Sequence, residues 1–107
     1  MTLAQFDAFR NTSKRPGAPP FLVVVQSSRF QDVPRRVAVP LVRREAIGLI
    51  DARLSPEFMV DGIAVVLATL ELASLPLSAF GERVANLNER GDDIVRAIDL
   101  VLSRAWD

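Results

Sequence analysis

The feature that most constrains the fold is a helical pattern that is clear only at the C-terminal end of the chain. Apolar residues recur there at three- and four-residue steps and share one helix face: Ile94, Ala97, Ile98, Val101 and Ala105. Asp92 is the predicted N-cap, because its carboxylate can accept hydrogen bonds from the free N–H groups of the first turn. The pattern predicts one amphipathic helix that runs from this aspartate to the C-terminus and packs on a small core.

The segments before this helix are short and have the composition of β-strands. Gln5–Arg10 alternates apolar and polar residues, Phe21–Gln26 is rich in β-branched residues, and Arg36–Leu41 alternates again. Asn11–Pro20 contains three of the seven prolines and is expected to be a flexible excursion between the first two strands. Pro40 is expected to end the third strand or to place it at a sheet edge, because proline has no N–H to donate.

The clearest turn signal is the dipeptide Asp61-Gly62, which stands between the apolar runs Glu57–Val60 and Ile63–Glu71. A type I′ turn requires positive φ at both central residues, and aspartate and glycine tolerate that conformation. The sequence therefore predicts a β-hairpin with its turn at this dipeptide.

Three further segments have weaker patterns. Val42–Leu54 is ambiguous, because its glutamate and alanine favour a short helix whereas Gly48 disfavours one. Ser74–Leu77 is expected to cross from the sheet to the helical region, and Ser78–Leu87 to form a short helical turn. The predicted fold of residues 1–107 is a single, mainly β domain with a C-terminal α-helix: a small, twisted or partly closed antiparallel sheet. Edges in so small a sheet need cover, which a homodimer can supply.

The residue types that most enzymes use at neutral pH are missing from this chain. Histidine and cysteine are absent, so the usual general base and the thiolate nucleophile are missing. Lys14 is the one lysine and lies in the flexible excursion beside Arg15, where burial of its amine is not expected. The five glycines are scattered and form no phosphate-binding loop. We therefore predict no catalytic, cofactor or metal site, and a protein that acts by binding rather than as an enzyme.

The charge is balanced, with 13 basic and 13 acidic residues. Two arginine pairs, Arg35-Arg36 and Arg43-Arg44, form either a local basic patch or ordinary solvated surface. Without a basic excess, direct binding of nucleic acid by this protein alone is not expected. No apolar run is long enough to span a bilayer. With no cysteine and no signal-peptide pattern, the expected location is the cytoplasm.

Two parts of the chain resemble the CcdB family. The first is Ala73-Ser74-Leu75-Pro76-Leu77-Ser78, followed by Gly81-Glu82, Val84-Ala85-Asn86-Leu87 and Asp93-Ile94, in the order and spacing of that family. The second is Val25-Gln26-Ser27 with Asp32-Val33-Pro34-Arg35-Arg36-Val37-Ala38-Val39-Pro40-Leu41, which has one residue fewer between proline and the arginines. Together they cover about two thirds of the chain.

The resemblance implies both a fold and a function. It implies a small SH3-like antiparallel barrel with a three-stranded wing sheet and a terminal helix, assembled as a two-fold homodimer. It also implies a toxin of a type II toxin–antitoxin module that binds the A subunit of DNA gyrase through its C-terminal helix, traps the enzyme on cleaved DNA and is neutralised by a CcdA-like antitoxin. Such a toxin changes no bonds itself and stabilises one state of its target.

The chain departs from the family pattern at the end of the helix. The family has Trp-Gly-Ile there, whereas the aligned residues are Ser103, Arg104 and Ala105, and a tryptophan follows only at Trp106. We take Leu102, Ser103, Arg104 and Trp106 as the candidate target-binding residues. Trp106 has three open roles: a frayed end, a staple that holds the helix down, or an anchor for a partner.

Two other functions remain open on the sequence. A CcdB-fold protein can bind an antitoxin or another protein without targeting gyrase. Toxins of the same barrel fold in a different family are mRNA endoribonucleases, although the lack of histidine and of a clear basic groove disfavours that activity.

Overall fold

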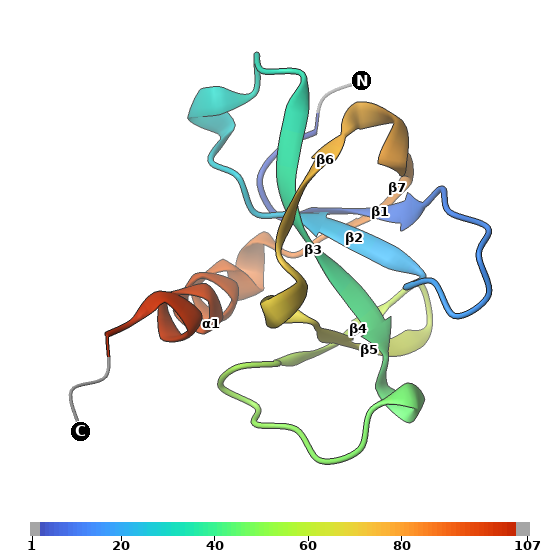
Figure 1. The fold of residues 1–107 in the computed structure, drawn as a ribbon, viewed down its shortest axis with the longest axis vertical. Helices are drawn as coiled ribbons and strands as arrows, with labels where there is room; N and C mark the ends of the chain where they lie inside the picture. The colour runs from blue at the N-terminus through green and yellow to red at the C-terminus, as the bar shows by residue number, and fades with distance from the viewer. Residues whose placement is uncertain (1–2, 105–107) are drawn as a thin grey trace.

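The computed structural model describes residues 3–104, which form one curled antiparallel sheet with a helix beside it (Figure 1). The seven strands are β1 (Asp7–Asn11), β2 (Phe21–Val24), β3 (Arg35–Arg43), β4 (Glu57–Val60), β5 (Ile63–Leu67), β6 (Ala73–Pro76) and β7 (Phe80–Asn86). The helix α1 spans Gly91–Leu102, and five short 3₁₀ turns join the elements: Ser28–Phe30, Arg44–Ala46, Thr69–Glu71, Leu77–Ala79 and Asn88–Arg90.

The sheet order is β4-β5-β3-β2-β1-β7, with every neighbouring pair antiparallel. The long strand β3 carries two partners along one edge, β6 at its start and β5 at its end. The last part of β3 therefore forms a three-stranded extension with β5 and β4, in the place of the expected wing. This curled sheet with a C-terminal helix confirms the predicted fold class.

Strand β2 lies at the centre of the sheet and is buried on both faces. Phe21 and Val23 face one apolar core, which also contains Ile94 of α1, whereas Leu22 and Val24 face a second core on the opposite side. This alternation follows from the two-residue period of a strand. The sheet therefore has one face covered by the helix and another face covered only by loops and a smaller apolar cluster.

The predicted hairpin is confirmed. Asp61 and Gly62 have φ of 50° and 76°, and the strands pair through Val60 opposite Ile63. The Asp61 carboxylate also accepts a hydrogen bond from Arg10 of β1 at 2.6 Å, and Arg10 donates a second one to Glu82 of β7 at 3.1 Å. These bonds, above all the one that Arg10 donates to Asp61, raise the pKa of Arg10. They link the turn at one end of the sheet to strands at the other.

Pro40 neither ends β3 nor marks its edge, so that expectation is wrong. It lies inside the strand, opposite Leu22 of β2. Its carbonyl oxygen accepts a hydrogen bond from the N–H of Ala68 at 2.9 Å. The nitrogen of Pro40 therefore faces the same edge of β3, at the point where the strand paired with that edge changes from β6 to β5. The proline is tolerated because its missing donor falls at this gap between two partners.

Two other expectations about local structure are wrong. Ser78–Leu87 is helical only at its first two residues, which end the 3₁₀ turn Leu77–Ala79; most of it is β7, which pairs with β1 from the far end of the chain. Asp92 is not the N-cap, because the 3₁₀ turn before the helix makes Arg90 the cap residue, and no side chain caps the helix. The ambiguous Val42–Leu54 begins with the last two residues of β3, continues with the 3₁₀ turn Arg44–Ala46 and ends in a long loop.

Candidate partner-binding surface

The first half of α1 is fixed firmly to the body of the protein. Ile94 and Ala97 are completely buried against the sheet. The ring of Phe6 packs so closely on Gly91 that a Cβ there would lie 2.6 Å from its Cε2 atom. Arg90 adds a third contact, since its guanidinium stacks over the Phe58 ring at 4.4 Å. These contacts set the direction in which the helix leaves the sheet.

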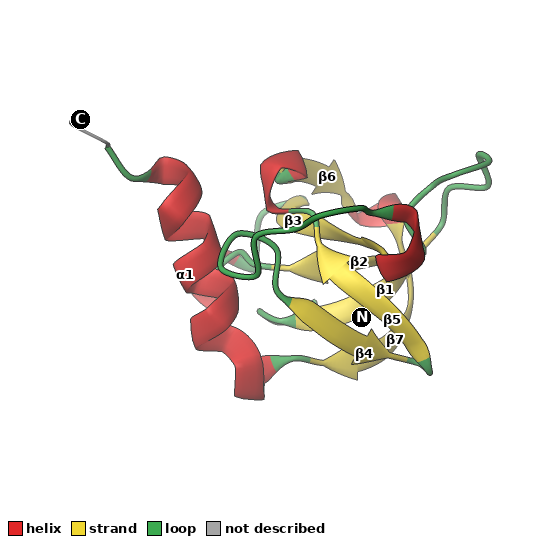
Figure 2. Cartoon of the chain, turned by 90° about the horizontal axis from the view of Figure 1, so that it is seen from below, coloured by secondary structure: helices red, strands yellow, loops and turns green. Residues whose placement is uncertain are grey.

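The second half of α1 extends beyond the sheet and exposes apolar side chains. Leu100, Val101 and Leu102 are 42%, 38% and 73% exposed. Figures 1 and 2 show the C-terminal turns of the helix pointing away from the strands. The predicted apolar face is therefore only half used by the core: Ile94 and Ala97 are buried, Ile98 is half-buried, and Val101 is exposed. Consecutive exposed apolar residues on a rigid helix are typical of a surface that another molecule covers.

The candidate site residues lie at and just beyond the end of this helix. Leu102 is its last residue, and Ser103 has extended backbone angles, φ −69° and ψ 150°. The Ser103 hydroxyl donates to the carbonyl oxygen of Leu100 at 3.0 Å, which satisfies one of the last free carbonyls of the helix. The prediction that the helix continues to the C-terminus is therefore wrong at Ser103 and Arg104, which are exposed but not helical. Trp106 lies outside the described residues.

Sequence analysis missed a second exposed apolar group. Phe30 and Val33, in the loop between β2 and β3, are 60% and 46% exposed. This loop is held from beneath by Arg36, whose guanidinium donates to the carbonyl oxygens of Val33 at 2.5 Å, Arg35 at 2.9 Å and Gln31. A phenylalanine and a valine within a mostly polar loop were the available signal.

The arginine pairs do not form the basic patch considered from the sequence. Arg36 is only 6% exposed, so it is part of the interior, and its Nε has no hydrogen-bond partner within the described part of the chain. Its neighbour Arg35 points outward and donates to Ser74 of β6 at 2.9 Å. Arg44 pairs with Glu57 at 3.3 Å. The alternating direction of side chains along a strand separates adjacent arginines onto opposite faces.

Charged groups at the base of α1 form a compact network. The Asp93 carboxylate accepts a hydrogen bond from Arg90 at 2.8 Å, and this bond, with the charges of Arg90 and Arg96, lowers the pKa of Asp93. Asp7 is buried and accepts from the side-chain amide of Asn86 at 2.8 Å. Both carboxylates are explained by contacts that hold elements together.

Neither metal ligation nor membrane spanning is indicated by the described part of the chain. Within residues 3–104, no three carboxylates come close enough together to hold a metal ion. None of the helices there has the length and apolar character needed to cross a membrane.

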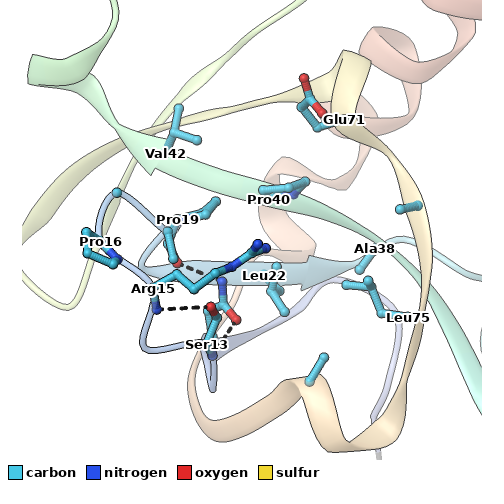
Figure 3. A pocket seen from close by; sticks show the side chains of 15 residues that line it. Ser13, Arg15, Pro16, Pro19, Leu22, Ala38, Pro40, Val42, Glu71 and Leu75 are labelled. Carbon is cyan, nitrogen blue, oxygen red and sulfur yellow. Dashed lines mark hydrogen bonds between the residues drawn. The ribbon is translucent and has the colours of Figure 1, made fainter.

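A cavity of about 750 Å³ lies on the face of the sheet opposite α1 (Figure 3). Its floor includes Leu22, Ala38 and Pro40, and the β1–β2 excursion forms one wall. That excursion, expected to be flexible, is bonded internally: Asn11 donates to the carbonyl oxygen of Pro19 at 3.0 Å and accepts from the N–H of Ser13 at 3.0 Å. No sequence pattern predicted this cavity, because its walls come from segments far apart in the chain.

Comparisons with known proteins bear on both the fold and the family. A solved structure described as an endoribonuclease in complex with its cognate antitoxin, from a mycobacterial species, matches 97% of this chain and 98% of its own chain with a TM-score of 0.74. Its sequence identity is 14%, so this similarity concerns the fold alone. The family model of the CcdB protein matches residues 5–103, nearly the whole chain. The protein is therefore a member of the CcdB family, as the two resembling segments indicated.

Proposed function

We propose that this protein is the toxin of a type II toxin–antitoxin module and that it acts by binding, without bond chemistry of its own. Its membership of the CcdB family supports a toxin. The observation that carries the mode of action is the projecting end of α1, where Leu102 is 73% exposed on a helix whose inner half is buried. The partner covers this end, and its affinity comes from burial of apolar surface.

The size of this apolar surface is adequate for a binding anchor. Burying a leucine side chain completely contributes about 1.5–3 kcal/mol. Leu100 and Leu102 are partly exposed, and Val101 lies between them. Because the helix is already formed and fixed at its base, little conformational entropy is lost when a partner binds it. Loss of one such residue is expected to weaken binding by about tenfold or more.

The proposed target is the A subunit of DNA gyrase, because that is the target implied by the CcdB resemblance. The family match ends at Ser103, so the last residues of the chain lie outside it. Here the family's Trp-Gly-Ile is replaced by Ser103, Arg104 and Ala105, which puts a cation where the family has glycine. We propose that Leu102 and Trp106 supply the apolar contacts with the target. We also propose that the charge of Arg104 changes which form of the gyrase A subunit the protein binds best. The alternative is that a CcdB-fold toxin of this sequence binds a different protein.

Two further partners belong to the proposal. One is a CcdA-like antitoxin, supported by family membership and by the antitoxin bound to the structural neighbour. The other is a second copy of this chain. The exposed apolar residues outside the helix end, such as Phe30 and Leu70, at 60% and 71% exposure, are available for such contacts.

An endoribonuclease is the second candidate, and the fold of the structural neighbour is the observation that favours it. The chain has no histidine. A ribonuclease built from these residues would need arginine and carboxylate groups to move the protons, and the carboxylates described above are engaged in structural contacts. This activity is therefore the less favoured one.

The experiment that separates these functions uses the purified protein and inducible expression. The proposal expects growth arrest on induction and accumulation of cleaved DNA when the protein is added to gyrase and plasmid. Growth arrest without cleaved DNA would remove gyrase as the target, and specific cleavage of a purified mRNA would support the endoribonuclease. Normal growth would show a binding protein that is not a toxin. Trp106→Ala is expected to abolish toxicity if this residue is the anchor, and unchanged toxicity would exclude that role.

A further inference from the structure

Arg36 is a buried cation with no anion beside it. The residue is 6% exposed, and within residues 3–104 no carboxylate forms an ion pair with its guanidinium. Its Nε–H has no acceptor in that part of the chain. A charge that is removed from water without an opposite charge nearby is costly. The hydrogen bonds that Arg36 does make must therefore offset the burial of its charge.

Those hydrogen bonds fasten the loop between β2 and β3. The guanidinium donates to the carbonyl oxygens of Val33 at 2.5 Å, of Arg35 at 2.9 Å and of Gln31. The N–H groups of Gln31 and Val33 bond only within the loop, to Ser28 and Phe30. In the described part of the chain, the bonds from Arg36 are thus the only hydrogen bonds that tie residues 31–34 to the sheet.

Little else holds this loop in place. Residues 28–35 are all exposed, including the apolar Phe30 and Val33. One further side chain reaches the loop, since Gln26 donates to the carbonyl oxygen of Phe30 at 2.8 Å. Figure 1 shows the loop, in cyan, extending beyond the ends of β2 and β3. Opening the loop would bring no buried loop side chain into water, so the hydrophobic effect does not oppose it.

We propose that residues 30–34 form a lid that opens as one unit while the sheet stays folded, and that Arg36 is its latch. In the closed state, charge-assisted hydrogen bonds hold the lid; in the open state, water hydrates the guanidinium instead. Such a segment opens at a lower free energy than the whole protein. The lid carries Phe30 and Val33, so its opening repositions two apolar side chains without disturbing the core. This inference does not depend on which protein is the target.

The first test is hydrogen exchange of the ¹⁵N-labelled full-length protein, measured by NMR at several low concentrations of urea. The Nε–H of Arg36 is a direct reporter, because burial alone protects it. This group and the amides of Phe30 and Val33 should exchange at rates that urea barely changes, because opening the lid exposes little surface. The amide of Val39, opposite Val23 in the sheet, should exchange only through global unfolding, at a rate that rises steeply with urea.

The second test removes the latch. Arg36→Met deletes the charge and leaves no polar side chain buried without a partner. The amides of Phe30 and Val33 should then exchange at least tenfold faster, the loss expected for hydrogen bonds from a charged donor. Tm should stay within about 4 °C of the wild type, because the uncompensated charge is lost together with its bonds. Arg35→Met is the matched control: its guanidinium binds Ser74 rather than the lid, so lid exchange should be unchanged.

Each measurement has a result that would overturn the proposal. If the Nε–H of Arg36 exchanges with the same steep urea dependence as the amide of Val39, the loop opens only when the whole protein unfolds. If Arg36→Met leaves the exchange of Phe30 and Val33 unchanged, Arg36 is not the latch. If that variant fails to fold or melts far below the wild type, Arg36 supports the sheet and not a movable lid. Asp32→Asn should leave lid exchange unchanged, and faster exchange would show that Arg36 has a carboxylate partner.

Discussion

Replacing Gly91 with alanine should destabilise the protein, although alanine is the better helix former. The new Cβ would lie 2.6 Å from Cε2 of Phe6 and 3.1 Å from two other atoms of that ring. Carbon atoms prefer separations of about 3.5–4.0 Å, so the ring or the helix must move by about 1 Å. Phe6 cannot move freely. Its N–H donates to Val24 at 2.6 Å, its carbonyl accepts from Leu87 at 2.8 Å, and its φ is 70°.

The expected magnitude follows from two opposing effects. Overpacking a tightly fitted site costs about 1–3 kcal/mol. Replacing glycine by alanine in a helix recovers at most about 0.5–1 kcal/mol. The net loss in the free energy of unfolding for Gly91→Ala is therefore about 1–2 kcal/mol, which for a domain of this size lowers Tm by about 5–10 °C. Urea denaturation followed by circular dichroism at 222 nm measures this change.

A matched variant and a double variant make the reasoning refutable. A Cβ added at Gly48 would meet no atom within 4 Å, so Gly48→Ala should change stability by no more than about 0.5 kcal/mol. Combining Gly91→Ala with Phe6→Leu should cost about 1 kcal/mol less than the sum of the single changes, because the ring that clashes is gone. If Gly91→Ala is as stable as the wild type, or if the two changes are additive, Phe6 does not fix the helix.

Three other predictions concern single contacts. Thr69→Val should lower the free energy of unfolding by about 1–2 kcal/mol, because the buried hydroxyl donates to the carbonyl oxygen of Leu54 at 2.5 Å. Amide exchange in the loop before β4 should become faster, and unchanged stability would contradict the contact. Arg10→Gln should lower the thermal midpoint only slightly, since the ion pairs of Arg10 are half exposed, and the difference from the wild type should shrink in 1 M salt. The pKa of Asp93 is lowered in the folded state by its hydrogen bond to Arg90, so its contribution to stability is present above the ordinary carboxylate pKa and is lost as the pH falls through the folded-state value. When the pH is lowered, the free energy of unfolding of Asp93→Asn should therefore fall less than that of the wild type. An equal fall in both proteins would refute the pairing of Asp93 with Arg90.

The parts of the fold that sequence predicted are those fixed by local chemistry. The hairpin turn at Asp61-Gly62 was predictable because only a few residue types tolerate its backbone angles. The buried face of α1 was predictable at Ile94 and Ala97 from the helical period alone. Strand β2 was predictable from its run of β-branched residues.

The parts that sequence did not predict depend on partners far away in the chain. β7 has a composition that suits a short helix, and it is a strand because β1, from the other end of the chain, pairs with it. Pro40 is accepted within β3 because the neighbouring strand changes at that point. The expected cap at Asp92 was displaced by the 3₁₀ turn at Asn88–Arg90, which moves the start of the helix.

The candidate target-binding residues stay a prediction, and the structure shows only where some of them lie. The sequence named Leu102 and Ser103 as candidates near the C-terminal end of a helix that was expected to run to the end of the chain, and in the structure both are exposed. Sequence could not show that the helix stops at Leu102, because its end depends on the loss of packing beyond the sheet and on the Ser103 hydrogen bond. The exposed Phe30 loop and the cavity required the assembled fold to be seen.

The central claim is that the projecting end of α1 holds the partner. The most direct test compares Leu102→Asp with Leu49→Asp, since these leucines are 73% and 105% exposed and neither supports the core. Both variants should melt as the wild type does. The account predicts that induced expression of Leu102→Asp no longer arrests growth and that its binding to the gyrase A subunit is at least tenfold weaker, whereas Leu49→Asp remains fully toxic. A folded Leu102→Asp variant that arrests growth as strongly as the wild type would contradict the claim.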